Sequence, residues 1–400
     1  MKKCELLAPA GTYKKMITAF QFGADAVYFA GKKFGLRAFA GNFEEDEIEK
    51  AVIYAHERNK KVYITINILA HEDDFEGLAD YVKYLEKINV DAVIVSDLGI
   101  IELIREVAPN LEIHVSTQAN ILNSYAIKFL AKLNIKRIIL AREVSVAEIK
   151  KIRKNIPEHI DLECFVHGAM CISYSGRCLL SNYLSGRDSN CGACVQACRW
   201  KYYITEVSRK DGSQYEIQQD ERGTYILNSK DLCMIEHLKE LQEAGVQSFK
   251  IEGRMKSEYY VATVVNAYRK AIDGYENLEE LKTELLKTSH RQYTTGFYFA
   301  SDDKECAESS MPVQTHEFMA IVLEDAINGY AKIEQRNRFR IGDRLEILSP
   351  NNETFNKEFV VEDIKNELGE TVEDAKQVQQ TLLIKTPFSL KKGDILRKLI

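Results

Sequence analysis

The chain has 400 residues, of which 45% are hydrophobic and 28% are charged, and this composition excludes collagen-like, low-complexity and membrane-spanning proteins. The N-terminus carries no apolar stretch long enough for a signal peptide, so we expect a cytoplasmic protein that does not enter a membrane. The net charge of −6 is unlike that of a general nucleic-acid binder, although it is compatible with a local basic patch. The length favours one large domain and one small domain.

Short apolar segments rich in Val and Ile alternate with helical patterns through the first 255 residues, which is typical of parallel strands buried on both faces. The number of such segments predicts an α/β fold, the (β/α)8 barrel of the TIM type. The predicted strands are residues 4–8, 24–30, 61–68, 91–96, 112–116, 137–141, 161–166 and 248–252. The long gap after the seventh strand predicts a cysteine-rich insertion at residues 168–230, within a barrel domain of residues 1–290.

The pattern changes after the barrel. Residues 257–275 read as a helix, and residues 291–315 show no clear period and read as a linker. Residues 316–400 show short β segments with two Gly-Asp turns, at 342–343 and 393–394. These features predict a small β-barrel as the C-terminal domain.

In a (β/α)8 barrel the chemistry lies at the C-terminal ends of the strands. The polar residues expected there include several cations and few unpaired acids: Arg37, Asn67, Ser96, Asp97, Ser116, Thr117, Gln118, Arg142, Glu143, His167, Glu252 and Arg254. This set suits a small anionic substrate, and Arg142, Arg254, Glu252 and His167 are the candidate catalytic residues. The alternative is that the arginines form structural ion pairs, Arg142 with Glu143 and Arg254 with Glu252.

Six of the nine cysteines fall between residues 164 and 198, and random scatter rarely gives such a cluster. Six residues separate Cys171 from Cys178, and three separate Cys194 from Cys198. Thiolates that leave a strand end on one loop can converge on one metal centre, either a structural zinc or an iron–sulfur cluster. A redox thiol pair, or a set of small buried residues, remains the alternative.

Residues 163–181 (ECFVHGAMCISYSGRCLLS) closely resemble the signature of peptidase family U32, and residues 6–11, 23–28 and 249–256 strengthen the resemblance. Residues 198–202 and 228–233 are similar to the branch of the family that hydroxylates tRNA. The resemblance implies a [4Fe–4S] protein that forms 5-hydroxyuridine at the tRNA wobble position, with prephenate, a small dicarboxylate, as oxygen source. By position, the implied cluster ligands are Cys171, Cys178, Cys194 and Cys198, and the additional Cys191 leaves the choice between Cys191 and Cys194 open.

Two other functions remain as alternatives. The family name suggests a collagenase-like peptidase, but the chain has no HExxH motif, and Ser175 lacks the first glycine of a GxSxG elbow. A Cys171 nucleophile with His167 as base is conceivable. The chain could also be a non-catalytic RNA-binding protein or one of two paralogous subunits.

The implied partner is a tRNA anticodon loop, whose bases are already unstacked. The basic segments that could contact RNA are residues 199–203, a set formed by Lys332, Arg336, Arg338 and Arg340, and a set formed by Lys385, Lys391, Lys392, Arg397 and Lys398. Charge runs on a β domain are also often plain solvated faces. Trp200, the single tryptophan, is either a core anchor or a platform for stacking a base.

Overall fold

The computed structural model describes residues 3–32, 34, 42–171, 173–187, 189, 194–200, 219–220, 223–224, 229–299 and 312–400. The chain forms two compact units. The first contains Met1–Met16, Asp25–Met255 and Arg291–Pro312, and the second contains Ile17–Ala24, Lys256–His290 and Val313–Ile400. No helix among the described residues is both long and apolar enough to cross a lipid bilayer.

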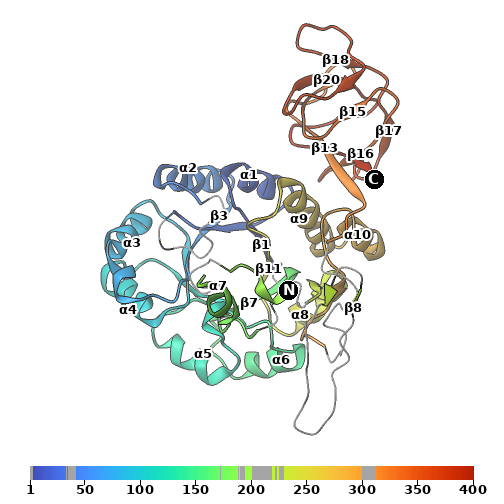
Figure 1. Ribbon diagram of the computed structural model, residues 1–400. Coiled ribbons are helices and arrows are strands. Elements are labelled where there is room, and N and C mark those ends of the chain that lie inside the picture. Colours follow the sequence, from blue (N-terminus) through green and yellow to red (C-terminus); the bar gives the residue numbers. More distant parts are fainter. Residues whose placement is uncertain are drawn as a thin grey trace. The chain divides into compact units, whose positions relative to one another are not determined.

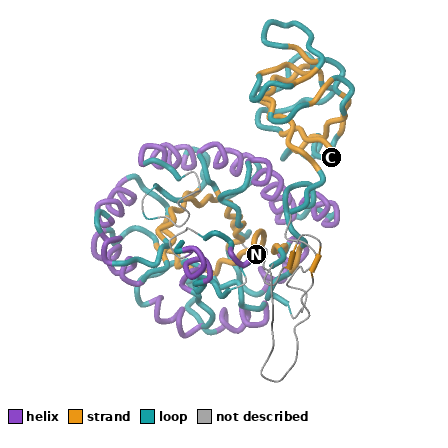
Figure 2. Tube along the Cα trace, in the orientation of Figure 1, coloured by secondary structure: helices purple, strands orange, loops and turns teal. Residues whose placement is uncertain are grey.

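The first unit confirms the predicted (β/α)8 barrel. Eight parallel strands form a closed ring, because each pairs with the next and the last pairs with the first. Figures 1 and 2 show this ring of strands inside a ring of helices. The strands are β1 (Glu5–Pro9), β2 (Ala26–Phe29), β3 (Lys61–Ile66), β4 (Ala92–Val95), β5 (Ile113–Val115), β6 (Arg137–Ile139), β7 (Asp161–Ala169) and β11 (Ser248–Ile251).

Helices follow most strands of the barrel, and several begin at the caps that the sequence supplies. Ser145 accepts a hydrogen bond from the backbone of Glu148 at the start of α6, and Asp97 caps α4 in the same way. The helices are α1 (Tyr13–Gln21), α2 (Glu45–His56), α3 (Leu78–Lys87), α4 (Leu98–Val107), α5 (Ser124–Ala131), α6 (Val146–Lys154), α8 (Leu238–Glu243), α9 (Glu258–Ile272) and α10 (Leu278–Leu285).

The cysteine-rich insertion leaves the barrel from β7, which runs three residues beyond the predicted end. The extension occurs because β10 (Asp231–Cys233) returns antiparallel to β7 and pairs with its last residues, from His167 to Ala169. A short strand, β12 (Tyr293–Thr294), lies beside β10. Within the insertion the described elements are α7 (Leu180–Ser185), the 3-10 turn η4 (Ala197–Arg199), and the short strands β8 (Gln219–Asp220) and β9 (Gly223–Thr224).

The interior of the barrel contains a network of buried charges. Arg137 donates hydrogen bonds to Glu5, at 2.5 Å, and to Glu163, at 3.1 Å, and Lys250 donates to the other oxygen of Glu163 at 3.0 Å. Burial alone would raise the pKa of Glu163, but Lys250 and Arg137 hold it below its usual range. Two carboxylates and two cations therefore balance one another inside the ring of strands.

The second unit contains the predicted C-terminal β domain. Its seven-stranded antiparallel sheet has the order β17-β16-β21-β13-β14-β20-β18, and within residues 313–400 no pairing joins β17 to β18, so the sheet is a half-barrel. Its hydrophobic core includes Met319, Ile333, Leu345 and Leu396. The strands are β13 (His316–Val322), β14 (Tyr330–Gln335), β15 (Phe339–Arg340), β16 (Arg344–Leu348), β17 (Glu358–Val360), β18 (Ile364–Lys365), β19 (Asp374–Ala375), β20 (Thr381–Lys385) and β21 (Ile395–Leu399).

Candidate active site at the C-terminal ends of the barrel strands

A pocket of about 70 Å³ lies inside the barrel toward the C-terminal ends of its strands. Among its lining residues are three cations and one carboxylate, so the pocket is suited to bind a small anion. The lining residues are Tyr28, Thr65, Asn67, Ile94, Ser116, Thr117, Gln118, Ile139, Arg142, Phe165, Lys250, Glu252 and Arg254.

Arg142 connects two walls of this pocket. Its Nη1 donates a hydrogen bond of 2.7 Å to the carbonyl oxygen of Ala169, and its Nη2 lies 3.5 Å from Glu252 Oε2. The guanidinium also lies over the ring of Phe165, 4.1 Å from its centroid. These contacts fix the plane of the guanidinium, and a planar fork that is held in place is suited to bind a carboxylate through two hydrogen bonds.

Arg254 is the second predicted cation of the pocket, and it is buried. Its Nη1 donates a hydrogen bond of 3.1 Å to Thr65 Oγ1, across the barrel on β3. Its carbonyl oxygen would lie 2.1 Å from a Cβ added at Gly11, so the backbone after β11 passes directly against the loop after β1. Close packing of these two loops holds Arg254 at the strand ends.

Arg142 does not form the ion pair with Glu143 that was the structural alternative to a role in binding. Arg142 pairs with Glu252 on the far side of β7, whereas Glu143 accepts a hydrogen bond of 2.9 Å from the backbone nitrogen of Ser175. The pairing crosses between strand ends and does not join neighbours along the chain. Glu143 thereby holds the cysteine loop, and Glu252 holds the guanidinium of Arg142.

Lys250 also lines the pocket, although it was not predicted to do so, because it lies within β11 and before the end of that strand. Only 3% of the residue is exposed, and its Nζ lies 4.3 Å from the ring centroid of Tyr28. Burial lowers the pKa of Lys250, and the charge of Glu163 partly opposes this effect. The alternation of strand side chains could have identified it, since Lys250 and Glu252 lie two residues apart and both line the pocket.

His167, the fourth predicted catalytic residue, is buried in β7 and is not among the residues that line the pocket. Its ring centroid lies 5.4 Å from that of Tyr293 on β12, and its carbonyl oxygen accepts a hydrogen bond of 2.9 Å from the backbone of Glu252. His167 thus fixes the backbone beside the pocket. Arg37, the third predicted anion-binding arginine, lies outside the described residues.

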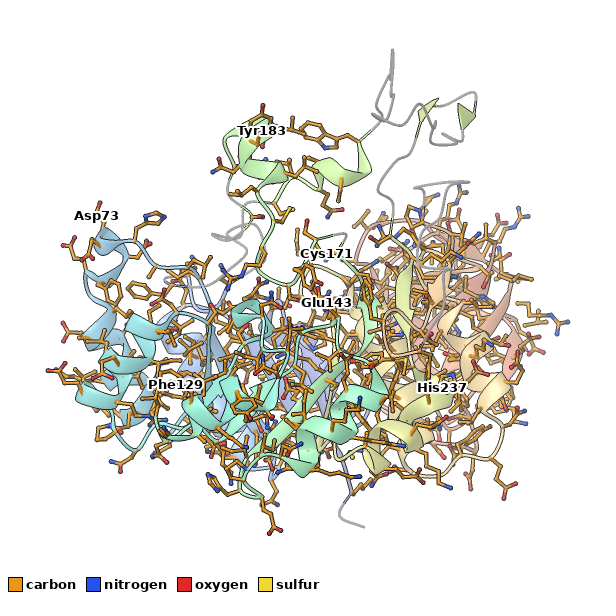
Figure 3. The ribbon with its side chains drawn as sticks, turned by 90° about the horizontal axis from the view of Figure 1, so that it is seen from below. Asp73, Phe129, Glu143, Cys171, Tyr183 and His237 are labelled. Carbon is orange, nitrogen blue, oxygen red and sulfur yellow. The ribbon has the colours of Figure 1, made fainter. Side chains whose placement is uncertain are left out.

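The loop that carries Cys171 and Cys178 is attached to the pocket edge. Ser175 binds Glu143, and a Cβ added at Gly176 would lie 2.2 Å from the carbonyl oxygen of Gln118. Figure 3 shows Cys171 and Glu143 on one side of the barrel, with Tyr183 of α7 farther out on the same side. The cysteine loop therefore covers the end of the barrel where the pocket lies.

The predicted ligand cysteines lie in neighbouring segments. Ser181, at the start of α7, accepts a hydrogen bond of 3.1 Å from the backbone nitrogen of Val195, beside Cys194. Loss of water around Cys171 raises the pKa of its thiol, and the thiols of Cys178 and Cys194 are close enough to contribute to the rise. Cys171, Cys178, Cys194 and Cys198 are not joined in disulfide bonds.

The chemistry of this donor set fits an iron–sulfur cluster, since thiolates are its usual ligands. Among the described residues, however, no group of three or more Cys, His, Asp or Glu side chains is arranged around a single metal ion. Cys191 lies outside the described residues, so the choice between Cys191 and Cys194 stays open. The thiols of Cys178 and Cys194 lie near that of Cys171, and the full ligand set stays a prediction.

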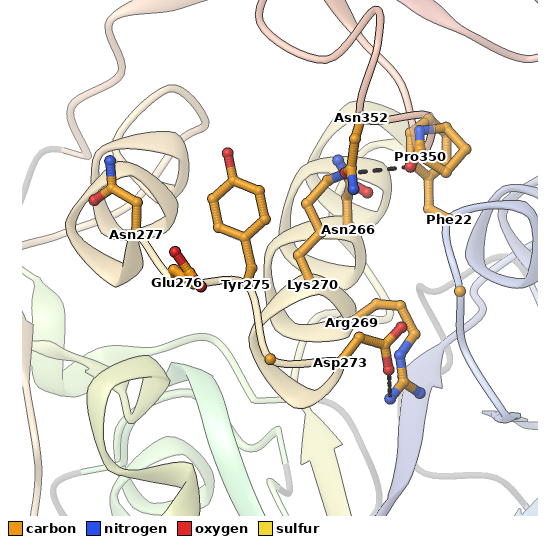
Figure 4. A pocket seen from close by; sticks show the side chains of 12 residues that line it. Phe22, Asn266, Arg269, Lys270, Asp273, Tyr275, Glu276, Asn277, Pro350 and Asn352 are labelled. Carbon is orange, nitrogen blue, oxygen red and sulfur yellow. Dashed lines mark hydrogen bonds and ion pairs between the residues drawn. The ribbon is translucent and has the colours of Figure 1, made fainter.

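A larger pocket of about 600 Å³ lies in the second unit (Figure 4), but its cations are engaged by protein groups. Arg269 forms an ion pair of 2.7 Å with Asp273, and Lys270 donates hydrogen bonds to Asn352 and to the carbonyl oxygen of Pro350. No cysteine lines this pocket. The cations of the barrel pocket are also bound to protein groups, but that pocket lies at the strand ends beside the cysteine loop and is therefore the better candidate for an active site.

The basic residues proposed for RNA contact in the C-terminal domain mostly pair with acids. Arg397 is fully buried and bound to Glu284 and Glu346, so its prediction as an RNA contact is wrong. Burial is possible because two carboxylates surround the guanidinium. Other members of the two sets form exposed ion pairs, which are Lys332 with Glu324, Arg338 with Asp374, Lys385 with Glu362, Lys391 with Asp325 and Lys398 with Asp343.

The chain is 40% identical over 408 residues to tRNA hydroxylation protein P1 of Bacillus subtilis, covering 99% of this chain and 95% of that protein. It is 36% identical to tRNA hydroxylation protein P of Escherichia coli, with 98% and 95% covered. A protein named collagenase from Porphyromonas gingivalis is 29% identical, with 94% and 93% covered. Residues 11–308 match peptidase family U32 and residues 314–397 match the C-terminal domain of that family, and the chain therefore belongs to peptidase family U32.

Proposed function

We propose that this protein hydroxylates a wobble uridine of tRNA to 5-hydroxyuridine, and that it binds a small dicarboxylate in the barrel pocket. The observation that carries the proposal is the cationic pocket directly beneath a loop rich in cysteines that form no disulfide. Relatives that cover nearly the whole chain are named tRNA hydroxylation proteins, which supports tRNA as the substrate. Prephenate is the dicarboxylate and oxygen source that the family resemblance implies.

The side chains of the pocket have separate roles in this proposal. Arg142 and Arg254 lie on different walls and each binds one carboxylate of the ligand, while Lys250 supplies positive charge at the floor. Glu252 orients Arg142 through their ion pair. Because the lining is largely buried, these interactions are stronger than they would be in water.

A [4Fe–4S] cluster, when bound, would be held by Cys171, Cys178, Cys194 and Cys198 and would transfer electrons. A structural zinc is the competing ligand for the same thiols. Anaerobic purification followed by metal and sulfide analysis distinguishes the two: about four iron and four sulfide per chain supports the cluster, and stoichiometric zinc contradicts it.

Peptidase activity is not favoured by the structure. A nucleophilic cysteine needs a lowered pKa, whereas the pKa of Cys171 is raised. The collagenase name belongs to a relative at 29% identity and does not extend to this chain.

The direct test is analysis of tRNA nucleosides by mass spectrometry in a strain that lacks the gene. We expect 5-hydroxyuridine and its derivatives to disappear, to return with the wild-type gene, and to stay absent with Arg142→Ala or Arg254→Ala. A strain blocked in prephenate synthesis should show the same loss. Unchanged 5-hydroxyuridine in the deletion strain, with no paralogous gene present, would refute the proposal. If the nucleoside is lost in cells but the purified protein is inactive, a second subunit is required.

A further inference from the structure

Large apolar side chains that face solvent gather on the cysteine-rich insertion. Tyr183 is 85% exposed, Tyr174 is 58% exposed and Trp200 is 41% exposed. Leu179 and Leu184 are also exposed beside them. A packed core does not explain side chains in this position, and exposed apolar groups that gather on one segment commonly mark a binding surface.

Hydrogen bonds join the segments that carry Trp200 and Tyr183. The Trp200 Nε1 donates a hydrogen bond of 3.2 Å to the carbonyl oxygen of Val195, and the backbone nitrogen of Val195 donates to Ser181 on α7. Ser181 lies two residues before Tyr183, and α7 packs against η4, which precedes Trp200. We call Tyr174, Tyr183 and Trp200 the aromatic surface. Trp200 is thus not a core anchor, since two fifths of it is exposed.

The aromatic surface lies on the side of the barrel where the pocket opens. Ser175 of the loop that contains Tyr174 donates a hydrogen bond to Glu143, and Gly176 packs closely against Gln118, which lines the pocket. Of the residues labelled in Figure 3, Tyr183 stands farthest from the barrel on that side. A macromolecule that placed one group in the pocket would therefore meet the aromatic surface.

The charge of this segment favours a polyanion. Residues 171–201 contain three arginines and one lysine against a single acidic residue, Asp188. The C-terminal domain differs, because most of its candidate RNA contacts are neutralised by neighbouring carboxylates. Aromatic rings in basic surroundings bind unpaired bases by stacking, and every base has a face that can stack.

We propose that the aromatic surface binds the unpaired bases of an RNA loop by stacking, and so presents the neighbouring base to the barrel pocket. This inference rests on the proposed function, since it takes tRNA as the substrate. It adds the surface that binds the RNA and the kind of contact. It also predicts that double-stranded RNA, whose bases are already stacked, binds more weakly.

Trp200 provides a direct test because the chain has no other tryptophan. The purified holoprotein is titrated with an anticodon stem–loop RNA while Trp200 fluorescence is recorded, and affinity is measured separately by filter binding. We expect the RNA to quench the emission, and a fully paired duplex of the same length to quench it far less.

The decisive variant is Tyr183→Ala, which removes one ring from the aromatic surface. It should weaken binding of the stem–loop about 5- to 150-fold, the range for removal of one stacked base contact. Tyr183→Phe keeps the ring and should bind as the wild type does. Tyr125→Ala is the matched control, because Tyr125 is 80% exposed but lies on α5, away from the aromatic surface. Phe129 of the same helix is labelled on the flank of the barrel in Figure 3.

The outcomes separate this inference from the proposed function. If the wild type forms 5-hydroxyuridine but the RNA binds without quenching and Tyr183→Ala binds equally well, the aromatic surface is not the RNA site. If Tyr183→Phe is as weak as Tyr183→Ala, stacking is not the contact. Metal content equal to the wild type shows that Tyr183→Ala leaves the cysteine loop intact, and a variant that loses metal is replaced by Tyr174→Ala for the same comparison.

Discussion

Arg142 donates a hydrogen bond of 2.7 Å to the carbonyl oxygen of Ala169, the last residue of β7. Cys171 follows two residues later, and the charge of Arg142 acts on its thiol. The same guanidinium lines the barrel pocket and pairs with Glu252. One side chain thus joins the anion-binding pocket to the beginning of the cysteine loop.

We predict that Arg142→Lys lowers kcat/KM for tRNA hydroxylation about 10- to 100-fold. Lysine keeps the charge but has no planar fork, so it cannot hold Ala169, Glu252 and a ligand carboxylate together. The loss corresponds to one or two hydrogen bonds that involve a charge. Steady-state kinetics with the dicarboxylate as the varied substrate measure it.

Arg153→Lys is the control for this prediction, because Arg153 also binds backbone carbonyl oxygens, those of Ile160 and Pro157, but does not line the pocket. It should change stability without changing kcat/KM. If kcat/KM of Arg142→Lys equals that of the wild type, Arg142 does not bind the ligand.

Lys250 is predicted to serve the ligand as well as the fold. Lys250→Met removes one of the two cations that pair with Glu163 and leaves Arg137 as the other, so it should cost about 3 kcal/mol of unfolding free energy. The double variant Lys250→Met/Glu163→Gln removes both charges and should regain most of that stability in urea titrations. Both the single and the double variant should lose hydroxylation activity, because neither has the cation at position 250. Recovery of activity together with stability would show that Lys250 is only structural.

The barrel was predictable because each of its strands is a local apolar segment. All eight predicted segments overlap the strands that form the ring, including β6, which has three residues. Arg142, Arg254 and Glu252 could be selected because parallel strands bring their C-terminal ends to one side of a barrel. The chain order of strand and helix was sufficient for this part of the site.

Contacts across the sheet were not predictable from local patterns. Lys250 meets Glu163 because β11 pairs with β7 in the register that places Ser248 opposite Glu163 and Lys250 opposite Phe165. Arg142 pairs with Glu252 and not with its neighbour Glu143 for the same kind of reason. The burial of Arg397 likewise depends on Glu284, which is 113 residues away in the sequence. Such pairs are set by tertiary structure, and propensity does not encode them.

The close approach of the cysteine loop to the barrel leads to a prediction about two glycines. Gly176→Ala places a Cβ 2.2 Å from the carbonyl oxygen of Gln118, so the loop must move away from the pocket. Gly186→Ala is the matched control, because Gly186 also has a positive φ, 67° against 72°, and nothing lies within 4 Å of its added Cβ. Both variants carry the same backbone cost, roughly 1 kcal/mol.

We expect Gly176→Ala to lose hydroxylation activity and part of its bound metal, and Gly186→Ala to keep both. Activity assays and metal analysis on the purified holoproteins give the comparison. If the two variants behave alike, the contact between the loop and Gln118 has no functional role.

The four predicted ligand cysteines should act together. Each single Cys→Ser variant should lose most of its bound iron, because a cubane cluster depends on its thiolate ligands. The four positions are Cys171, Cys178, Cys194 and Cys198. Cys233→Ser is the control, since Cys233 pairs with His167 beside the loop but is not a predicted ligand. Cys191→Ser decides the open position: if it loses iron while Cys194→Ser keeps it, Cys191 is the ligand. Iron loss in Cys233→Ser equal to the others would show that any disturbance of this region releases the metal.

The last prediction concerns the stability of the second unit. Arg397, on β21, donates to both oxygens of Glu284 on α10, at 2.5 and 2.7 Å, and its Nε donates to Glu346 at 2.7 Å. Arg397→Met would leave these carboxylates buried without their main cation, at a cost of about 3–5 kcal/mol. Arg344→Met is the control, because Arg344 forms an exposed pair with Glu358 that contributes under about 1 kcal/mol.

The dependence on pH gives a second readout for the same cluster. Burial raises the pKa of Glu346, but Arg397 and Lys287 lower it by a larger amount. The pKa of Glu346 in the folded protein therefore lies below its unfolded value. The stabilising contribution is therefore complete above the unfolded pKa, near 4.3, and is lost as the pH falls through the folded pKa. In urea titrations from pH 7 to pH 3, the wild type should lose stability over this interval. Arg397→Met should lose less, because the pKa of Glu346 then rises toward or above its unfolded value. Equal pH profiles for the two proteins would show that Arg397 does not control the ionisation of Glu346.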